Sequence, residues 1–145
     1  MRTVVLGILL ALGAAGAASA GDYVIVASTN PALKPGTEVD GGQRLSLEPG
    51  QTLRLMNATG EVSTLRGSAA GVVAPKPGAP IDATRMAQLR VLIDPPPQGR
   101  TFGGRRSGVC PDPATLTSLD QILAVQAAGC APQAREALEA YLAAR

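Results

Sequence analysis

Alternating apolar and polar positions dominate the chain after residue 20. The segment DYVIVAST at 22–29 alternates, yet both of its faces are mostly apolar, which is typical of a strand covered on both sides. Leu45 and Leu47 share one face of a second segment, and Leu53 and Leu55 share one face of a third, with a Pro-Gly turn between them. The pattern predicts a small antiparallel β-meander with one solvent-facing side.

The segment EVSTLRG at 61–67 departs from this period. Val62 and Leu65 are an odd number of residues apart, so a regular strand directs them to opposite faces. A bulge at Ser63-Thr64 would return both side chains to the same face, and we expect one there.

Helical patterns follow a stretch rich in Gly, Pro and Ala at 68–81, which is interpreted as a linker or an ordered surface loop. Asp82 is placed to cap a helix that ends before the three prolines after Asp94. The residues spaced at three and four along this helix, which predict its buried face, are Met86, Leu89, Arg90 and Ile93.

The two cysteines of the chain, Cys110 and Cys130, flank a further helical pattern. A helix starting directly after Asp112 would span roughly 24 Å, whereas a disulfide tolerates about 4.4 to 6.8 Å between Cα atoms. A later start, with Thr117 as the N-cap and Asp120 completing a capping box, gives a helix over 118–128 and lets the preceding segment run back alongside it.

Gly129 is then expected as the left-handed residue that ends this helix and leaves Cys130 free to meet Cys110. The bond closes a loop worth about 3 kcal/mol in the chain-entropy model. A structural disulfide is favoured over a redox-active pair, which usually has the C-x-x-C spacing, and over a zinc site, which would lack histidine ligands.

The predicted fold class is α+β: a small antiparallel β-meander or sandwich, then a helix and a disulfide-pinned C-terminal helical hairpin. We expect residues 21–67 to form a β-rich segment and 82–145 a helical segment, joined by 68–81 into one compact domain. Residues 1–20 match a secretory signal peptide, with a basic residue, an apolar run and the small-residue triplet Ala18-Ser19-Ala20. We therefore expect a periplasmic or secreted protein without stable membrane insertion after signal removal.

Composition narrows the function classes. The chain has 13 basic and 11 acidic residues, and one of the basic residues, Arg2, lies in the predicted signal peptide. This near balance, with only two Tyr, one Phe and no Trp, indicates neither a nucleic-acid surface nor a stacking platform.

The chain contains no histidine, so serine–histidine and cysteine–histidine sites are excluded. Its carboxylates are spread along turns and helix starts, and only Lys34 and Lys76 are available for a serine–lysine site. We expect a protein that is not an enzyme, with no catalytic residues, no metal site and no cofactor.

Three arginines, Arg100, Arg105 and Arg106, are interleaved with glycines and form a possible anion-binding loop. The alternative, which we favour, is a solvated turn that pairs with Asp94 or Asp112. Asn57-Ala58-Thr59 matches a glycosylation sequon, which we interpret as a chance match.

The segment PGTEVDGGQRLSLEPGQTLRLMNATGEVSTLRG resembles, in its short strands and Gly turns, small exported β-domains of the FecR type. It also resembles uncharacterised small secreted bacterial proteins with a cysteine-containing tail. The resemblance rests on apolar and glycine positions, covers about a quarter of the chain and implies no site residues. FecR-type signalling proteins have a transmembrane segment that we do not find here, so a signalling role does not follow.

Two function hypotheses remain. The first is an exported, non-enzymatic interaction or structural module, in which an exposed sheet edge or the apolar side of the tail meets a protein partner in the cell envelope. The second is a small binder of anionic envelope ligands through Arg100, Arg105 and Arg106. The patterns predict no oligomeric state.

Overall fold

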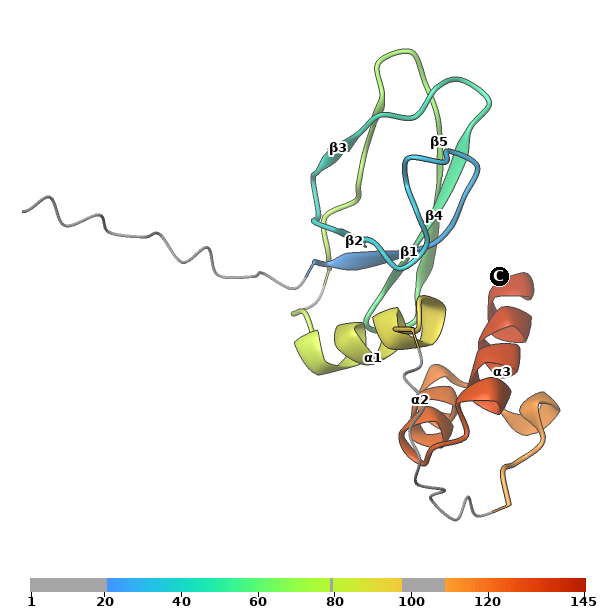
Figure 1. Cartoon of the computed structure of the whole chain (residues 1–145). Helices are drawn as coiled ribbons and strands as arrows, with labels where there is room; N and C mark the ends of the chain where they lie inside the picture. The colour runs from blue at the N-terminus through green and yellow to red at the C-terminus, as the bar shows by residue number, and fades with distance from the viewer. Residues whose placement is uncertain (1–20, 79, 98–108) are drawn as a thin grey trace, which may run out of the picture.

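The structure, a computed structural model, describes residues 21–78, 80–97 and 109–145. It is an α+β fold in which the strands lie at one end and the three labelled helices at the other (Figure 1). The elements in chain order are β1 (Tyr23–Ser28), β2 (Glu38–Val39), β3 (Arg44–Leu45), β4 (Thr52–Asn57), β5 (Val62–Arg66), β6 (Val72–Val73), α1 (Ala83–Ile93), the 3-10 helix η1 (Pro113–Thr115), α2 (Leu119–Ala127) and α3 (Ala131–Ala143).

The main sheet has four antiparallel strands in the order β2-β1-β4-β5. The strand that carries Leu45 does not join it: β3 pairs instead with β6, inside the Gly/Pro/Ala-rich segment, to form a second, two-stranded sheet. The β region is therefore a small sandwich, and β1 and β4 are its central strands. The expected simple meander is wrong at β3, because alternation predicts a strand but does not identify its neighbour.

Both faces of the main sheet carry buried apolar side chains, so the expectation of one solvent-facing side is also wrong for most of its length. Residues from the two sheets together make one cluster: Tyr23, Ile25, Val39, Leu45, Leu47, Leu53, Leu55 and Ala74. The opposite face packs against the helices.

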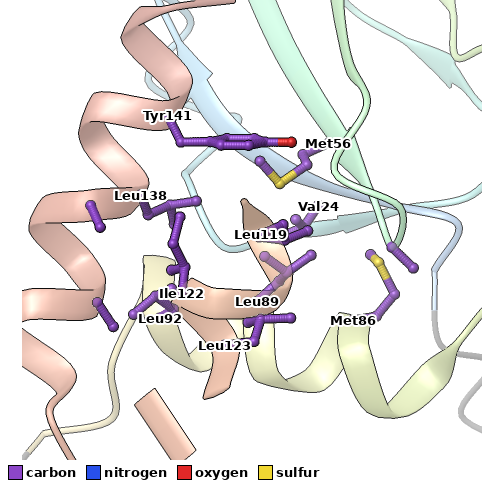
Figure 2. Packing of buried hydrophobic residues seen from close by; sticks show 13 residues of the cluster. Val24, Met56, Met86, Leu89, Leu92, Leu119, Ile122, Leu123, Leu138 and Tyr141 are labelled. Atoms are coloured by element: carbon purple, nitrogen blue, oxygen red, sulfur yellow. The ribbon is translucent and has the colours of Figure 1, made fainter. Parts of the chain in front are cut away.

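This second face contributes Val24 and Met56 to the larger cluster, which Figure 2 shows from close by. Each of α1, α2 and α3 adds buried side chains to it, and the Tyr141 ring lies beside Met56. The helical members are Met86, Leu89, Leu92, Leu119, Ile122, Leu123, Ala134, Ala137, Leu138 and Tyr141. One sheet thus separates two cores, which explains why β1 is apolar on both faces, as the sequence predicts.

The same arrangement overturns the predicted bulge at Ser63-Thr64. Strand β5 pairs with β4 without interruption, and the register irregularity lies between Ile25 and Ala27 of β1 instead. Val62 packs against the helical core and Leu65 against the inter-sheet core. A bulge is unnecessary because each face of β5 has an apolar surface to cover.

Helix α1 begins where the sequence predicts, with the Asp82 carboxylate accepting a hydrogen bond from the Arg85 amide at 3.0 Å. Its buried face differs slightly from the expectation. Leu92 is buried, whereas Arg90 is exposed and forms an ion pair with Glu38 on the adjoining strand. The face is rotated because Leu92 follows Leu89 at helical spacing and is the more apolar candidate.

The predicted helical hairpin and disulfide are present. Cys110 and Cys130 are bonded, with 5.8 Å between their Cα atoms. The N-cap of α2 is Ser118 rather than Thr117, and the capping box is completed by Gln121 rather than Asp120. The shift by one residue follows from the side chains present, since the Gln121 side-chain oxygen accepts a hydrogen bond from the Ser118 backbone amide at 3.2 Å.

Gly129 ends α2 with φ of +95°, as expected. The Gly129 amide donates to the Gln126 carbonyl and the Cys130 amide donates to the Val125 carbonyl, a Schellman arrangement. Cys130 is then the N-cap residue of α3. In the part of the chain that the structure describes, no helix is long and apolar enough to cross a bilayer.

Candidate functional site

The outer edge of β5 presents backbone groups that have no hydrogen-bond partner among the described residues. The β4–β5 hairpin is anchored at one end by the Asn57 amide donating to Glu61 and at the other by the Gly67 amide donating to Gln51. Hydrogen-bonded pairs in an antiparallel ladder alternate, so Ser63 and Leu65 point their amides and carbonyls toward β4. The alternate residues of β5 therefore direct theirs away from the sheet.

These outward-facing residues are Val62, Thr64 and Arg66. Within 21–78, 80–97 and 109–145 none of their backbone amides or carbonyls has a hydrogen-bond partner. The opposite edge of the sheet, β2, is only two residues long, and so are both strands of the second sheet. Because short strands offer little ladder for another chain to join, β5 is the edge best suited to accept one.

A hollow of about 420 Å³, lined by threonine and arginine side chains, lies beside this edge. Its walls include Thr52 and Arg54 of β4 and Thr64 and Arg66 of β5. The register pairs Thr52 with Arg66 and Arg54 with Thr64, so all four side chains belong to the face that packs on the helices further along the same strands. The hollow is lined by residues of β4, β5 and the adjoining loops, and α3 comes close to it where the Leu142 carbonyl accepts a hydrogen bond from Arg54.

Two glycines, Gly50 and Gly67, line the rim of the hollow. A Cβ on Gly67 would overlap the Glu48 carbonyl, so only glycine fits where β5 ends and the chain passes close to the preceding turn. Gly50, also on the rim, has no heavy atom within 4 Å of its own Cβ position. Because neither glycine carries a side chain, this part of the rim does not cover the two arginines.

The hollow is positively charged. The ion pairs between described residues join Arg85 to Asp120 and Arg90 to Glu38, and neither involves Arg54 or Arg66. The half-buried Arg54 donates from Nη2 to the Leu142 carbonyl at 2.9 Å, near the end of α3. Arg66 is exposed and makes no side-chain hydrogen bond to another described residue. The site therefore combines outward-facing backbone groups with two arginines that form no ion pair with any carboxylate in the described part of the chain.

A second hollow, of about 370 Å³, lies between α1 and α2. Its walls are mainly apolar and include Ala87, Leu123 and Val91, which is 47% exposed. The Gln126 side chain crosses it, donating to the Gln88 carbonyl at 3.3 Å. This surface corresponds most closely to the apolar side of the tail in the first hypothesis, but it offers no charge or backbone pattern that selects an occupant.

Of the site residues predicted from the sequence, those that the structure describes do not line either hollow. Arg100, Arg105 and Arg106 lie outside the described residues. Cys110 and Cys130 form the disulfide. Asn57 is occupied by the β4–β5 turn: its Oδ1 accepts from the Thr59 amide and hydroxyl and from the Glu61 amide, and its Nδ2 donates to the Glu61 carboxylate at 3.3 Å.

Across the described residues no group of three or more His, Cys, Asp or Glu side chains is placed to hold a metal ion. Burial, followed by the negative charges of Glu61 and Asp22, raises the pKa of Tyr23 above its ordinary value of 10.0, and Tyr23 lies in the inter-sheet core.

Arg54 and Arg66 are not among the site residues predicted from the sequence, although a signal is present. Thr52 and Arg54 occupy alternate positions of one strand and Thr64 and Arg66 alternate positions of the next, so pairing the strands would have gathered them on one face. Searches against protein-family models, curated proteins and solved structures find no significant match to this chain.

Proposed function

We propose that this protein is an exported, non-enzymatic interaction module that binds an extended segment of a protein partner as an additional strand along β5. The observation that carries the proposal is the row of backbone amides and carbonyls at Val62, Thr64 and Arg66 without hydrogen-bond partners among the described residues. Adding a strand to an open edge satisfies such groups, and it is a recurring mode of peptide recognition.

The rest of the fold is suited to this role. Strand β5 is backed by β4 and β1, whose side chains fill both cores, so the edge is held on a rigid support. A disulfide is typical of proteins in an oxidising compartment, and the pattern at 1–20 predicts export. We place the module in the periplasm or outside the cell on these two grounds.

The second hypothesis, an anion binder acting through Arg100, Arg105 and Arg106, has no further observation in its favour. The arginines that the fold gathers are Arg54 and Arg66. An anionic group therefore enters the proposal as part of the strand-adding partner.

A backbone block tests strand addition. Thr64→Pro removes one outward amide, which proline at an edge strand can do without loss of a ladder hydrogen bond. Thr64→Val keeps the amide and the β-branched shape, and is the matched control. A photo-crosslinking residue at Ser63 in both variants reports contact with a partner in the exporting cell.

The proposal predicts a discrete crosslinked product with Thr64→Val that is lost with Thr64→Pro. A product of equal yield in both variants, or no product with either, contradicts strand addition at β5. Equal denaturation midpoints of the two purified variants establish that a difference in yield does not come from unfolding.

A further inference from the structure

The arginine-lined hollow selects which chain can lie against β5. Arg54 and Arg66 line the same hollow on one face, and neither has an ion pair among the described residues. Two neighbouring cations held at a sheet edge repel a positively charged occupant and attract a negatively charged one. The backbone groups of β5 can therefore accept another strand, and the two arginines favour a strand that carries negative charge.

A second copy of this chain is a poor occupant. Two β5 strands pairing antiparallel about Thr64 would bring two copies of the hollow together, placing Arg54 and Arg66 of each protomer on the same face of one continuous sheet. Arg66 of each protomer would lie opposite Val62 of the other, so the four arginines share one face without being directly opposite, and charged side chains at edges are a common protection against self-association. The same arginines that oppose self-pairing favour a carboxylate.

The register states where that carboxylate would lie. A residue added opposite Thr64 projects to the face of Thr64, and in the ladder Thr64 is itself opposite Arg54. Arg66 is the diagonal neighbour on the same face, within reach of a long side chain. A glutamate or aspartate opposite Thr64 would therefore point into the hollow, with threonine hydroxyls on both strands as further hydrogen-bond donors.

We propose that the segment accepted by β5 belongs to a different protein and carries an acidic side chain opposite Thr64, whose carboxylate is bound between Arg54 and Arg66. This inference rests on the proposed function, because it specifies the chemistry of the partner that strand addition requires. Charge-assisted hydrogen bonds from arginine to carboxylate provide the selectivity.

The test compares two short synthetic peptides of alternating threonine and valine, one with a central glutamate and the other with a central glutamine. Binding of each to the full mature chain is followed by fluorescence anisotropy of a labelled peptide. The inference predicts that the glutamate peptide binds about tenfold more tightly at low ionic strength and that added salt reduces this preference.

Arginine variants locate the effect. Arg66→Gln is the primary variant, because the Arg66 side chain is exposed and has no ion pair with another described residue. It should remove most of the preference for glutamate. Arg44→Gln changes another exposed strand arginine, one that donates to the Ala70 carbonyl away from the hollow, and should leave the preference unchanged.

The outcomes separate the two proposals. Equal binding of the two peptides, or equal failure of both to bind, overturns the acidic-partner inference. If both peptides bind equally and Thr64→Pro abolishes binding, strand addition is supported and the requirement for an acidic side chain is wrong. If the preference for glutamate survives Thr64→Pro, the hollow binds free anions and strand addition fails. A dimer that Thr64→Pro dissociates would assign β5 to a second copy and overturn the inference.

Discussion

The Tyr141 hydroxyl donates a hydrogen bond to the Gly60 carbonyl at 3.1 Å, joining α3 to the β4–β5 turn across 81 residues of sequence. Gly60 is buried and has φ of +87°, and a Cβ at that position would lie 2.7 Å from the Tyr141 hydroxyl oxygen. This hydrogen bond therefore holds α3 against the β4–β5 hairpin, whose outer strand is β5.

Removal of this hydroxyl should destabilise the protein. Tyr141→Phe leaves the buried Gly60 carbonyl without its partner, which costs about 1 to 3 kcal/mol of unfolding free energy. Tyr23→Phe is the matched control, since Tyr23 is also buried but makes no side-chain hydrogen bond to another described residue. Urea unfolding measures both variants, and an equal loss in the two would contradict a specific role for the Tyr141 contact.

The close approach at Gly60 predicts a second difference. Gly60→Ala and Gly50→Ala both place a side chain at positive φ, at a cost of about 1 to 2 kcal/mol, but only Gly60 has atoms in the way. Gly60→Ala should therefore lose more stability than Gly50→Ala. Combining it with Tyr141→Phe removes the nearest of those atoms, so the two losses should be less than additive. Strict additivity would show that the hydroxyl does not constrain the turn.

Reduction of the disulfide should lower stability without abolishing the helical hairpin. The bond joins residues separated by 20 positions, for which the chain-entropy model gives about 3 kcal/mol. Denaturation with and without reductant measures the change, and the double variant Cys110→Ser, Cys130→Ser is insensitive to reductant and serves as the control. An unchanged midpoint on reduction of the native chain would contradict a structural role for the bond.

Alkaline pH should destabilise the fold through Tyr23. Burial, with the charges of Glu61 and Asp22, raises the pKa of Tyr23 in the folded protein above the value of 10.0 expected when unfolded. Below pH 10.0 the phenol is protonated in both states, and above it the unfolded state loses the proton first, so stability falls as pH rises through this window. The pH dependence of urea unfolding should be steeper for the native chain than for Tyr23→Phe, and identical slopes would contradict the shift.

Much of the fold could be predicted from local sequence signals. The Asp82 cap, the left-handed Gly129 and the disulfide each follow from a few neighbouring residues. The requirement that Cys110 reach Cys130 also moved the start of α2 close to its observed position. Here the covalent constraint added geometric information that periodicity alone does not contain.

The candidate site could not be predicted from the sequence, because it depends on which strands pair, and local sequence patterns do not determine that pairing. Alternation identifies Leu45 and Leu53 as strand residues, but it does not reveal that β3 joins β6 rather than β4. The assumption of a single core produced the expected bulge at Ser63-Thr64, whereas two cores allow Val62 and Leu65 to face opposite sides. The open edge of β5 follows from this strand order, and so does the meeting of Arg54 with Arg66.

Amide hydrogen exchange along β5 tests the central claim most directly. The account predicts an alternating pattern, with slow exchange at Ser63 and Leu65, which donate to β4, and fast exchange at Val62, Thr64 and Arg66, which face outward. An acidic, strand-forming peptide should then slow exchange at the outward set. Uniform protection of all five amides in the free protein would show that the edge is already covered, and would contradict the proposed binding surface.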